Sequence, residues 1–104
     1  MIRMAIFYPK TSDSHFDMDY YLNKHMPLLI ARLSAMGLQK GEVDEGLGTA
    51  VPDQPAPYAV ITYLIFDTIE HLQQGFGSHG AELMGDIPNF TNVQPVTQIS
   101  RIAL

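Results

Sequence analysis

The sequence contains no cysteine, and this absence removes several kinds of chemistry. Without thiols the chain has no disulfide, no thiolate nucleophile and no cysteine-based metal site. Basic residues are also scarce: six Lys and Arg stand against eleven Asp and Glu, and the net charge is −5. Because nucleic-acid binding needs clustered basic side chains, we expect no nucleic-acid partner.

Long apolar runs are missing as well. No run approaches the roughly 18 residues that are needed to cross a bilayer, so we expect no membrane partner. The first ten residues, MIRMAIFYPK, lack the long apolar region and small-residue cleavage site of a signal peptide. These features predict a cytoplasmic location. A length of 104 residues predicts a single domain, residues 1–104, around one modest core.

Hydrophobic patterning predicts six elements in the order βαββαβ. The expected elements are a strand over Met1–Tyr8, a helix from an N-cap at Asp17 to Gly37, a strand or hairpin arm over Leu38–Thr49, a strand over Tyr58–Phe66, a helix from Asp67 to about Gly85, and a last strand within Thr91–Leu104. Asp67 followed three residues later by Glu70 resembles a capping box. This order predicts a ferredoxin-like α+β fold, an antiparallel sheet with two helices on one face.

The segment Tyr58–Phe66, YAVITYLIF, is apolar on both sides of the expected strand. Two helices cover only one face of the sheet, which would leave the other apolar face exposed to water. Because a patch of this kind promotes association, we expect a homodimer that stacks two sheets face to face.

The stretch Phe16–Leu29, FDMDYYLNKHMPLL, places a proline inside the first predicted helix. An interior proline costs on the order of 3 kcal/mol in a regular helix, so we expect a kink or a break at Pro27. Either change frees a backbone carbonyl near His25. Helical spacing puts one stripe of side chains on the same face, which we expect to look towards the sheet: Tyr21, His25, Leu28, Leu29 and Arg32.

The second predicted helix places another histidine on its inward stripe. That stripe consists of Ile69, Leu72, Phe76, His79 and Leu83. Three glycines beside His79 weaken this helix by roughly 1 kcal/mol each relative to alanine. They either allow very close packing or leave room for a ligand. A core histidine with satisfied hydrogen bonds remains the alternative interpretation for both His25 and His79.

These side chains suit acid–base chemistry on a small molecule. Histidine exchanges protons near neutral pH, and tyrosine can donate a hydrogen bond to a developing enolate or phenolate oxygen. We therefore predict His25 and Tyr21 as catalytic residues. The predicted substrate-binding residues are Tyr20, Leu29, Arg32, Phe76 and His79. We interpret the segment Asp86–Thr91 as a turn and a helix stop.

Metal binding is not expected, because the four histidines form no HxH or HExxH pattern. We expect no other cofactor, with haem as an open alternative, since a single axial histidine leaves almost no sequence signature.

Two segments resemble the signature segments of the EthD family, named for ethyl tert-butyl ether degradation. They are YPK…FDMDYYLNKHMPLL and DIPNFTNVQPVTQIS, and the resemblance covers essentially the whole chain. It implies a dimeric α+β barrel. Proteins similar to this family occur beside monooxygenase systems and in aromatic polyketide tailoring. Relatives by fold include isomerases, cofactor-free monooxygenases and haem-degrading enzymes.

The leading functional hypothesis is a small homodimeric enzyme or accessory protein of organic-compound catabolism. It would bind a small hydrophobic, aromatic or enolisable metabolite, with His25 as acid and base. If the protein is an enzyme, we expect a cofactor-independent isomerase or lyase, or an activity related to monooxygenases. The alternatives are a non-catalytic carrier module and a haem-binding or haem-degrading protein.

Overall fold

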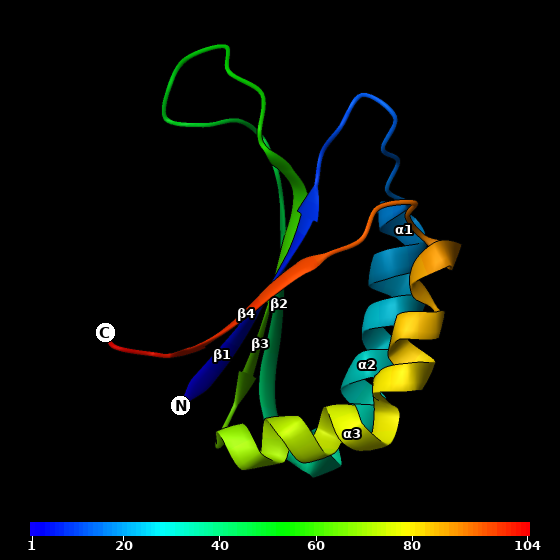
Figure 1. Ribbon diagram of the computed structural model, residues 1–104, viewed down its shortest axis with the longest axis vertical. Coiled ribbons are helices and arrows are strands. Elements are labelled where there is room, and N and C mark those ends of the chain that lie inside the picture. Colours follow the sequence, from blue (N-terminus) through cyan, green and yellow to red (C-terminus); the bar gives the residue numbers. More distant parts are fainter.

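The elements follow the predicted order in a computed structural model that describes residues 1–104 (Figure 1). The strands are β1 (Ile2–Pro9), β2 (Leu38–Glu45), β3 (Tyr58–Phe66) and β4 (Val96–Arg101), and the helices are α1 (Met18–Tyr20), α2 (Met26–Leu33) and α3 (Ile69–Gly85). A π-helical turn, η1 (Tyr21–His25), joins α1 to α2, and two short 3₁₀ turns, η2 (Ser34–Met36) and η3 (Ile87–Asn89), follow α2 and α3. The arm expected over Leu38–Thr49 stops being a strand at Glu45.

The four strands form one antiparallel sheet in the order β2-β3-β1-β4. All the helices lie on one side of this sheet, and the loop between β2 and β3 projects beyond its end (Figure 1). The predicted ferredoxin-like fold is therefore confirmed.

The core fills the space between the sheet and the helices. Alternate residues of β3 point into it and are buried: Val60, Thr62, Leu64 and Phe66. Leu29 and Leu33 of α2 and Leu72 and Leu83 of α3 pack against them from the helical side. The period of two along the strand and the helical period along α2 and α3 thus meet in one cluster.

The other residues of β3 lie on the sheet face that no helix covers. They are Ala59, Ile61, Tyr63 and Ile65, and all are half-buried. The guanidinium of Arg3, on β1, lies 5.8 Å from the ring centroid of Tyr63 on this face. The single chain leaves this apolar surface without a covering layer, as the sequence predicts.

The first helix begins and turns in a way that explains Pro27. Asp17 is the N-cap, as predicted, and its carboxylate accepts the backbone N–H of Tyr20 at 3.0 Å. The N–H of Met26 then bonds back to the carbonyl of Tyr21, five residues earlier, which defines the wide π turn. After this turn Pro27 falls in the first turn of α2, where a missing N–H is tolerated. The widened turn therefore accommodates the proline without a break in the helical segment.

The predicted capping box at the start of α3 is wrong by one residue. Thr68 is the N-cap, with extended backbone, and its hydroxyl accepts the N–H of His71 at 3.1 Å. Asp67 instead accepts the N–H of Thr68 and lies 2.8 Å from Nδ1 of His71. A threonine hydroxyl one residue nearer the helix outcompetes the carboxylate for the capping position.

Glycines let the helices pack closely at two places. Gly37, which ends the first helix as predicted, has φ +93°, and a Cβ there would lie 2.5 Å from a carboxylate oxygen of Asp67. A Cβ on Gly75 would lie 3.1 Å from a methyl of Leu33, so α3 approaches α2 through this glycine. α3 turns a corner along its length, and its later part runs beside α2 (Figure 1).

Candidate active site

His25 is buried inside the fold and is held by aromatic rings. His25 is the last residue of the π turn η1 and is only 3% exposed. The imidazole stacks on Tyr21 with centroids 5.3 Å apart and planes 14° apart, and it also meets Phe90 at 4.6 Å. These contacts fix the plane of the ring.

Asp86 binds one nitrogen of this imidazole. Its Oδ2 lies 2.8 Å from Nδ1 of His25, and the two residues are 61 positions apart in the chain. The other carboxylate oxygen accepts the Tyr20 hydroxyl at 2.7 Å and the side-chain amide of Asn89 at 2.9 Å. Asp86 therefore ties the start of the first helix to the end of α3, and the carboxylate orients the ring.

The electrostatics keep Asp86 ionised. Burial favours the neutral carboxyl, but the three side-chain hydrogen bonds that it accepts outweigh burial, and the pKa of Asp86 lies below its ordinary value. The same carboxylate raises the pKa of the Tyr20 phenol. Since an ionised carboxylate only accepts hydrogen bonds, Nδ1 of His25 carries the proton, and Nε2 of the neutral ring is an acceptor.

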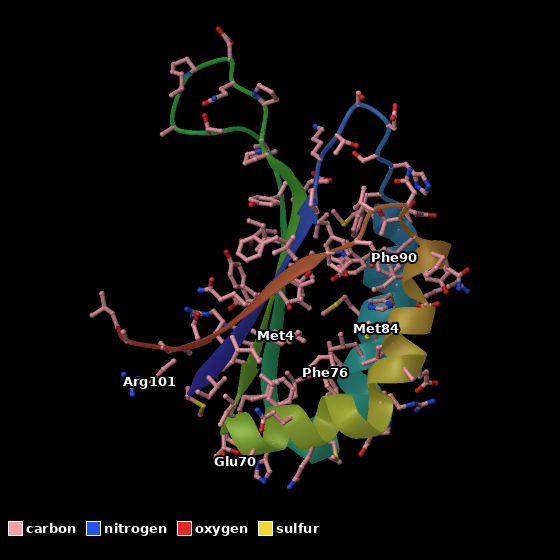
Figure 2. All side chains as sticks on the ribbon, in the orientation of Figure 1. Met4, Glu70, Phe76, Met84, Phe90 and Arg101 are labelled. Atoms are coloured by element: carbon pink, nitrogen blue, oxygen red, sulfur yellow. The ribbon has the colours of Figure 1, made fainter.

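A cavity of about 270 Å³ lies on the side of the imidazole between the sheet and the helices. Its wall is mostly apolar and comes from β1, the helical segments, the residues just before β4 and β4 itself: Met4, Ile6, Tyr8, His25, Leu29, Phe76, Leu83, Met84, Ile87, Gln94, Pro95 and Thr97. Figure 2 shows Met4 on the sheet side of this space and Phe76 and Met84 on α3. Met84 is 66% exposed, so the cavity meets solvent near that residue.

The second nitrogen of His25 is open to this cavity. Nδ1 is the atom bound to Asp86, and no hydrogen bond joins Nε2 to another group of the chain. Every buried side-chain nitrogen or oxygen has a hydrogen-bond partner. Nε2 therefore retains accessible surface, and the cavity that His25 lines supplies it.

A larger hollow, about 660 Å³, is formed by residues 47–55 of the projecting loop alone. It brings together no histidine, tyrosine or basic side chain. We place the candidate site at His25, because there a mostly apolar hollow meets a buried imidazole that a carboxylate orients.

The structure places the predicted site residues in two groups. His25, Leu29 and Phe76 line the cavity. Tyr21 and Tyr20 lie outside its wall: the Tyr21 hydroxyl is 2.6 Å from Oγ1 of Thr62 in the core, and the Tyr20 hydroxyl is on Asp86. Both tyrosines support the imidazole, Tyr21 by stacking and Tyr20 through the carboxylate.

The expected inward direction is wrong for Arg32. Its side chain is 43% exposed and pairs with Glu82 of α3, with Nε 2.9 Å from a carboxylate oxygen. The π turn changes the phase of the helix, so the residues that face the core are offset from a regular α-helical stripe. Arg32 therefore bridges α2 and α3 at the surface.

His79 does not share the cavity with His25. It is half-buried on α3 and lies close enough to Glu82 for its charge to help lower the pKa of that carboxyl, after the larger effect of the Arg32 hydrogen bond. The stripe predicted from the sequence assumes a straight helix, whereas α3 bends in its middle (Figure 1).

Sequence reasoning missed two residues that matter here. Asp86 was interpreted as part of a turn, and its position just after a helix gave no sign that it meets His25. Tyr8 was placed in the first strand and in the YPK of the first signature segment but was given no role in the site, although it lines the cavity with His25. The signal that could have pointed to Asp86 is the motif DIPNF. It lies beside the motif NKHMPL in the folded chain, which brings Asp86 to His25. The backbone N–H of Asp17 binds the carbonyl of Phe90 at 2.7 Å, which docks the two motifs together.

Two further features bear on the site. The chain holds no group of three or more His, Cys, Asp or Glu side chains that is placed to bind a metal ion. None of its helices combines the length and the apolar character that a membrane span requires.

Solved structures of similar proteins cover nearly the whole chain. An EthD-like protein from Ralstonia eutropha is 34% identical, with a TM-score of 0.93, over 99% of this chain and 92% of that one. An EthD family protein from Bacillus halodurans is 19% identical, with a TM-score of 0.67 and 97% of each chain covered. A dimeric ferredoxin-like protein from an uncultured marine organism is 14% identical, with a TM-score of 0.63, over 100% of this chain and 96% of that one, and shares the fold.

No match was found among curated proteins. The family profile of the EthD domain matches residues 9–94, which include the motifs around His25 and Asp86. The chain belongs to the EthD family.

Proposed function

We propose that this protein acts on a small, largely apolar metabolite that is enolisable or phenolic, with His25 as the acid and base, in organic-compound catabolism. The observation that carries the proposal is the imidazole itself. It is buried, bound to a carboxylate through Nδ1, and open through Nε2 to an apolar cavity. A nitrogen acceptor in such surroundings is suited to remove a proton from carbon or oxygen.

Asp86 serves as the positioning residue. It keeps the proton on Nδ1 and stabilises the imidazolium that forms when Nε2 takes a second proton. Because the pKa of Asp86 lies below its ordinary value, the carboxylate remains charged at neutral pH. Tyr20 and Asn89 hold the carboxylate in place.

The cavity volume limits the size of the metabolite. About 270 Å³ lies just below the range of roughly 300–1,000 Å³ that is typical of ligand pockets. A single ring or a short branched chain suits this space. A porphyrin is much larger, so the cavity of the single chain gives no support to the haem alternative.

Exchange of ketone protons tests the proposed chemistry. We expect the wild-type protein to accelerate the exchange of the α-protons of 2-indanone in D₂O above the buffer rate, as followed by ¹H NMR. His25→Gln should reduce this acceleration at least 100-fold, because general acid–base catalysis contributes about 10²–10⁴-fold. His71→Gln is the matched control, since His71 also bonds an aspartate through Nδ1 but lies exposed and outside the cavity.

The outcome separates the enzyme from the carrier alternative. Binding of 2-indanone without any acceleration, by the wild type and by His25→Gln alike, would favour a carrier. Equal acceleration by wild type and His25→Gln would contradict the role of the imidazole.

We also propose that two copies associate through the uncovered sheet face. The face carries Ala5, Phe7, Ile61, Tyr63 and Ile65 at its centre, on the two middle strands. Charged residues of β2, such as Glu42 and Asp44, and polar residues of β4 border it. An apolar centre with a polar rim is typical of a protein interface.

Light scattering after size exclusion tests this association. The wild type should have the mass of two chains, and Ile61→Glu should have the mass of one, because a charge would be placed at the centre of the face. Ala81→Glu, at an exposed position of α3, is the control and should leave the mass unchanged. A wild-type mass of one chain would contradict the proposal.

A further inference from the structure

We propose that Tyr8 is the second polar group of the site and donates a hydrogen bond to an oxygen of the ligand while His25 takes the proton. This inference rests on the proposed function and defines which groups the ligand must carry. Tyr8 lies on β1, as the first residue of the YPK that opens the first signature segment, and its place beside His25 is visible only in the folded structure.

The Tyr8 side chain is almost completely buried, and its hydroxyl has only a weak contact with the hydroxyl of Tyr21. The residue is 2% exposed and packs edge-on against Phe16, Tyr21 and Phe90, with centroids 5.1–5.8 Å apart. The neighbouring Tyr21 hydroxyl is bound to Thr62, and Tyr8 has no partner at normal hydrogen-bond geometry. Since no buried side-chain oxygen lacks a partner, the Tyr8 hydroxyl retains accessible surface.

That surface belongs to the same cavity as the open nitrogen of His25. Both residues line it, and both rings rest on Tyr21 and Phe90. A shared aromatic base of this kind fixes the two polar atoms relative to each other. The remaining wall around them is mainly Met, Ile, Leu and Phe. Two convergent polar groups in an apolar hollow form the usual pattern of a small-molecule site.

The phenol of Tyr8 stays protonated under all physiological conditions. Burial raises its pKa above the ordinary value, and the nearby Tyr21 hydroxyl adds to the rise. Tyr8 is therefore a permanent donor. His25, with its proton held on Nδ1 by Asp86, presents an acceptor at Nε2.

One donor and one acceptor select the ligand. The partner must accept a hydrogen bond from Tyr8 and offer a proton to His25, which a phenol does with one hydroxyl and a ketone does with its carbonyl oxygen and an adjacent C–H. In the ketone, the C–H bond breaks and its proton moves to Nε2. The electron pair shifts to the carbonyl oxygen, where the Tyr8 hydrogen bond stabilises the enolate. Return of the proton to another carbon gives an isomer, and no co-reactant is consumed.

Binding of fluorinated probes tests the role of Tyr8. Dissociation constants of 4-fluorophenol and fluorobenzene are measured by ¹⁹F NMR. The dissociation constant of fluorobenzene divided by that of 4-fluorophenol is the ratio that reports what the phenol oxygen contributes. Tyr8→Phe should lower this ratio about five-fold, the effect of one hydrogen bond, and should leave fluorobenzene binding unchanged. Tyr63→Phe, on the opposite face of the sheet, is the control and should leave the ratio unchanged.

A second test compares two probes on the wild-type protein alone, so it does not depend on whether a variant folds. The ether oxygen of 4-fluoroanisole can accept from Tyr8 but has no proton to give, and 1-ethyl-4-fluorobenzene has the same shape without the oxygen. We expect the ether to bind at least as tightly although it is the less hydrophobic of the two. Clearly weaker binding of the ether would overturn the assignment.

The failures of the two proposals are distinguishable. If the wild type binds neither 4-fluorophenol nor fluorobenzene, the cavity holds no such ligand and both proposals fall. If the wild type prefers the phenol and Tyr8→Phe keeps the same ratio, the Tyr8 inference falls while the role of His25 stands.

Discussion

The buried hydrogen bond between Tyr21 and Thr62 makes a quantitative prediction about the core. Both residues are fully buried, and their hydroxyl oxygens are 2.6 Å apart. Thr62→Val replaces one hydroxyl by a methyl of nearly the same size, and Tyr21→Phe removes the other. Either change leaves one polar group buried without its partner.

The asymmetry of hydrogen-bond energetics gives the magnitude. Each single variant should lose about 1–3 kcal/mol of unfolding free energy, the cost of a buried unsatisfied group. The double variant should lose no more than one single variant, because both polar groups are then gone and only the net hydrogen bond, about 0.5–1.5 kcal/mol, is missing. The coupling energy of the cycle should therefore be about 1–3 kcal/mol.

Urea unfolding at one fixed protomer concentration measures the cycle, since an associating protein has a concentration-dependent stability. The cycle is repeated with Tyr8→Phe, because the Tyr8 hydroxyl is the nearest substitute partner for Tyr21. Additive effects, or single variants that lose less than about 0.5 kcal/mol, would refute the reasoning. Unchanged m-values show that the compared states are the same.

Three further predictions concern the supports of the site and of the fold. Gly37→Ala should lose about 1–3 kcal/mol of unfolding free energy in urea, because φ is +93° and the new Cβ would meet Asp67, whereas Gly77→Ala, with open space at its Cβ, should not destabilise the protein. Thr68→Ala removes an N-cap, which should cost about 1 kcal/mol of stability and lower the melting temperature. Thr68→Ser keeps the capping hydroxyl and should retain most of the wild-type stability. Asp86 has a pKa below its ordinary value in the folded state, so its stabilising effect is complete at neutral pH and is lost as pH falls from about 4 through the folded pKa. Asp86→Asn should thus have a lower unfolding free energy than wild type at pH 7, but its unfolding free energy should fall less than that of wild type below about pH 4. Urea unfolding at several pH values measures this, and an equal decrease in both proteins below pH 4 would contradict the prediction.

The order of the elements followed from the sequence because the signals that set it are local. Alternating apolar residues in Tyr58–Phe66 and the N-cap at Asp17 each act within a few residues, and both predictions are confirmed. Gly37 ended the first helix as expected, because only a residue without a Cβ adopts its backbone conformation easily. The inward turn of His25 was also predicted, from its spacing to the apolar residues of the same helix.

The tertiary structure decided which distant groups meet that histidine. Asp86 lies 61 residues away, and nothing in its local sequence shows that a strand and a bent helix return it to His25. The sequence favoured Arg32 because it assumes regular α-helical spacing, and the π turn removes that regularity. Tyr8 lines the cavity because β1 lies in the middle of the sheet, a position set by pairing with two strands from the second half of the chain. Periodicity is a property of neighbouring residues, whereas a cavity is made by side chains that only long-range packing brings together.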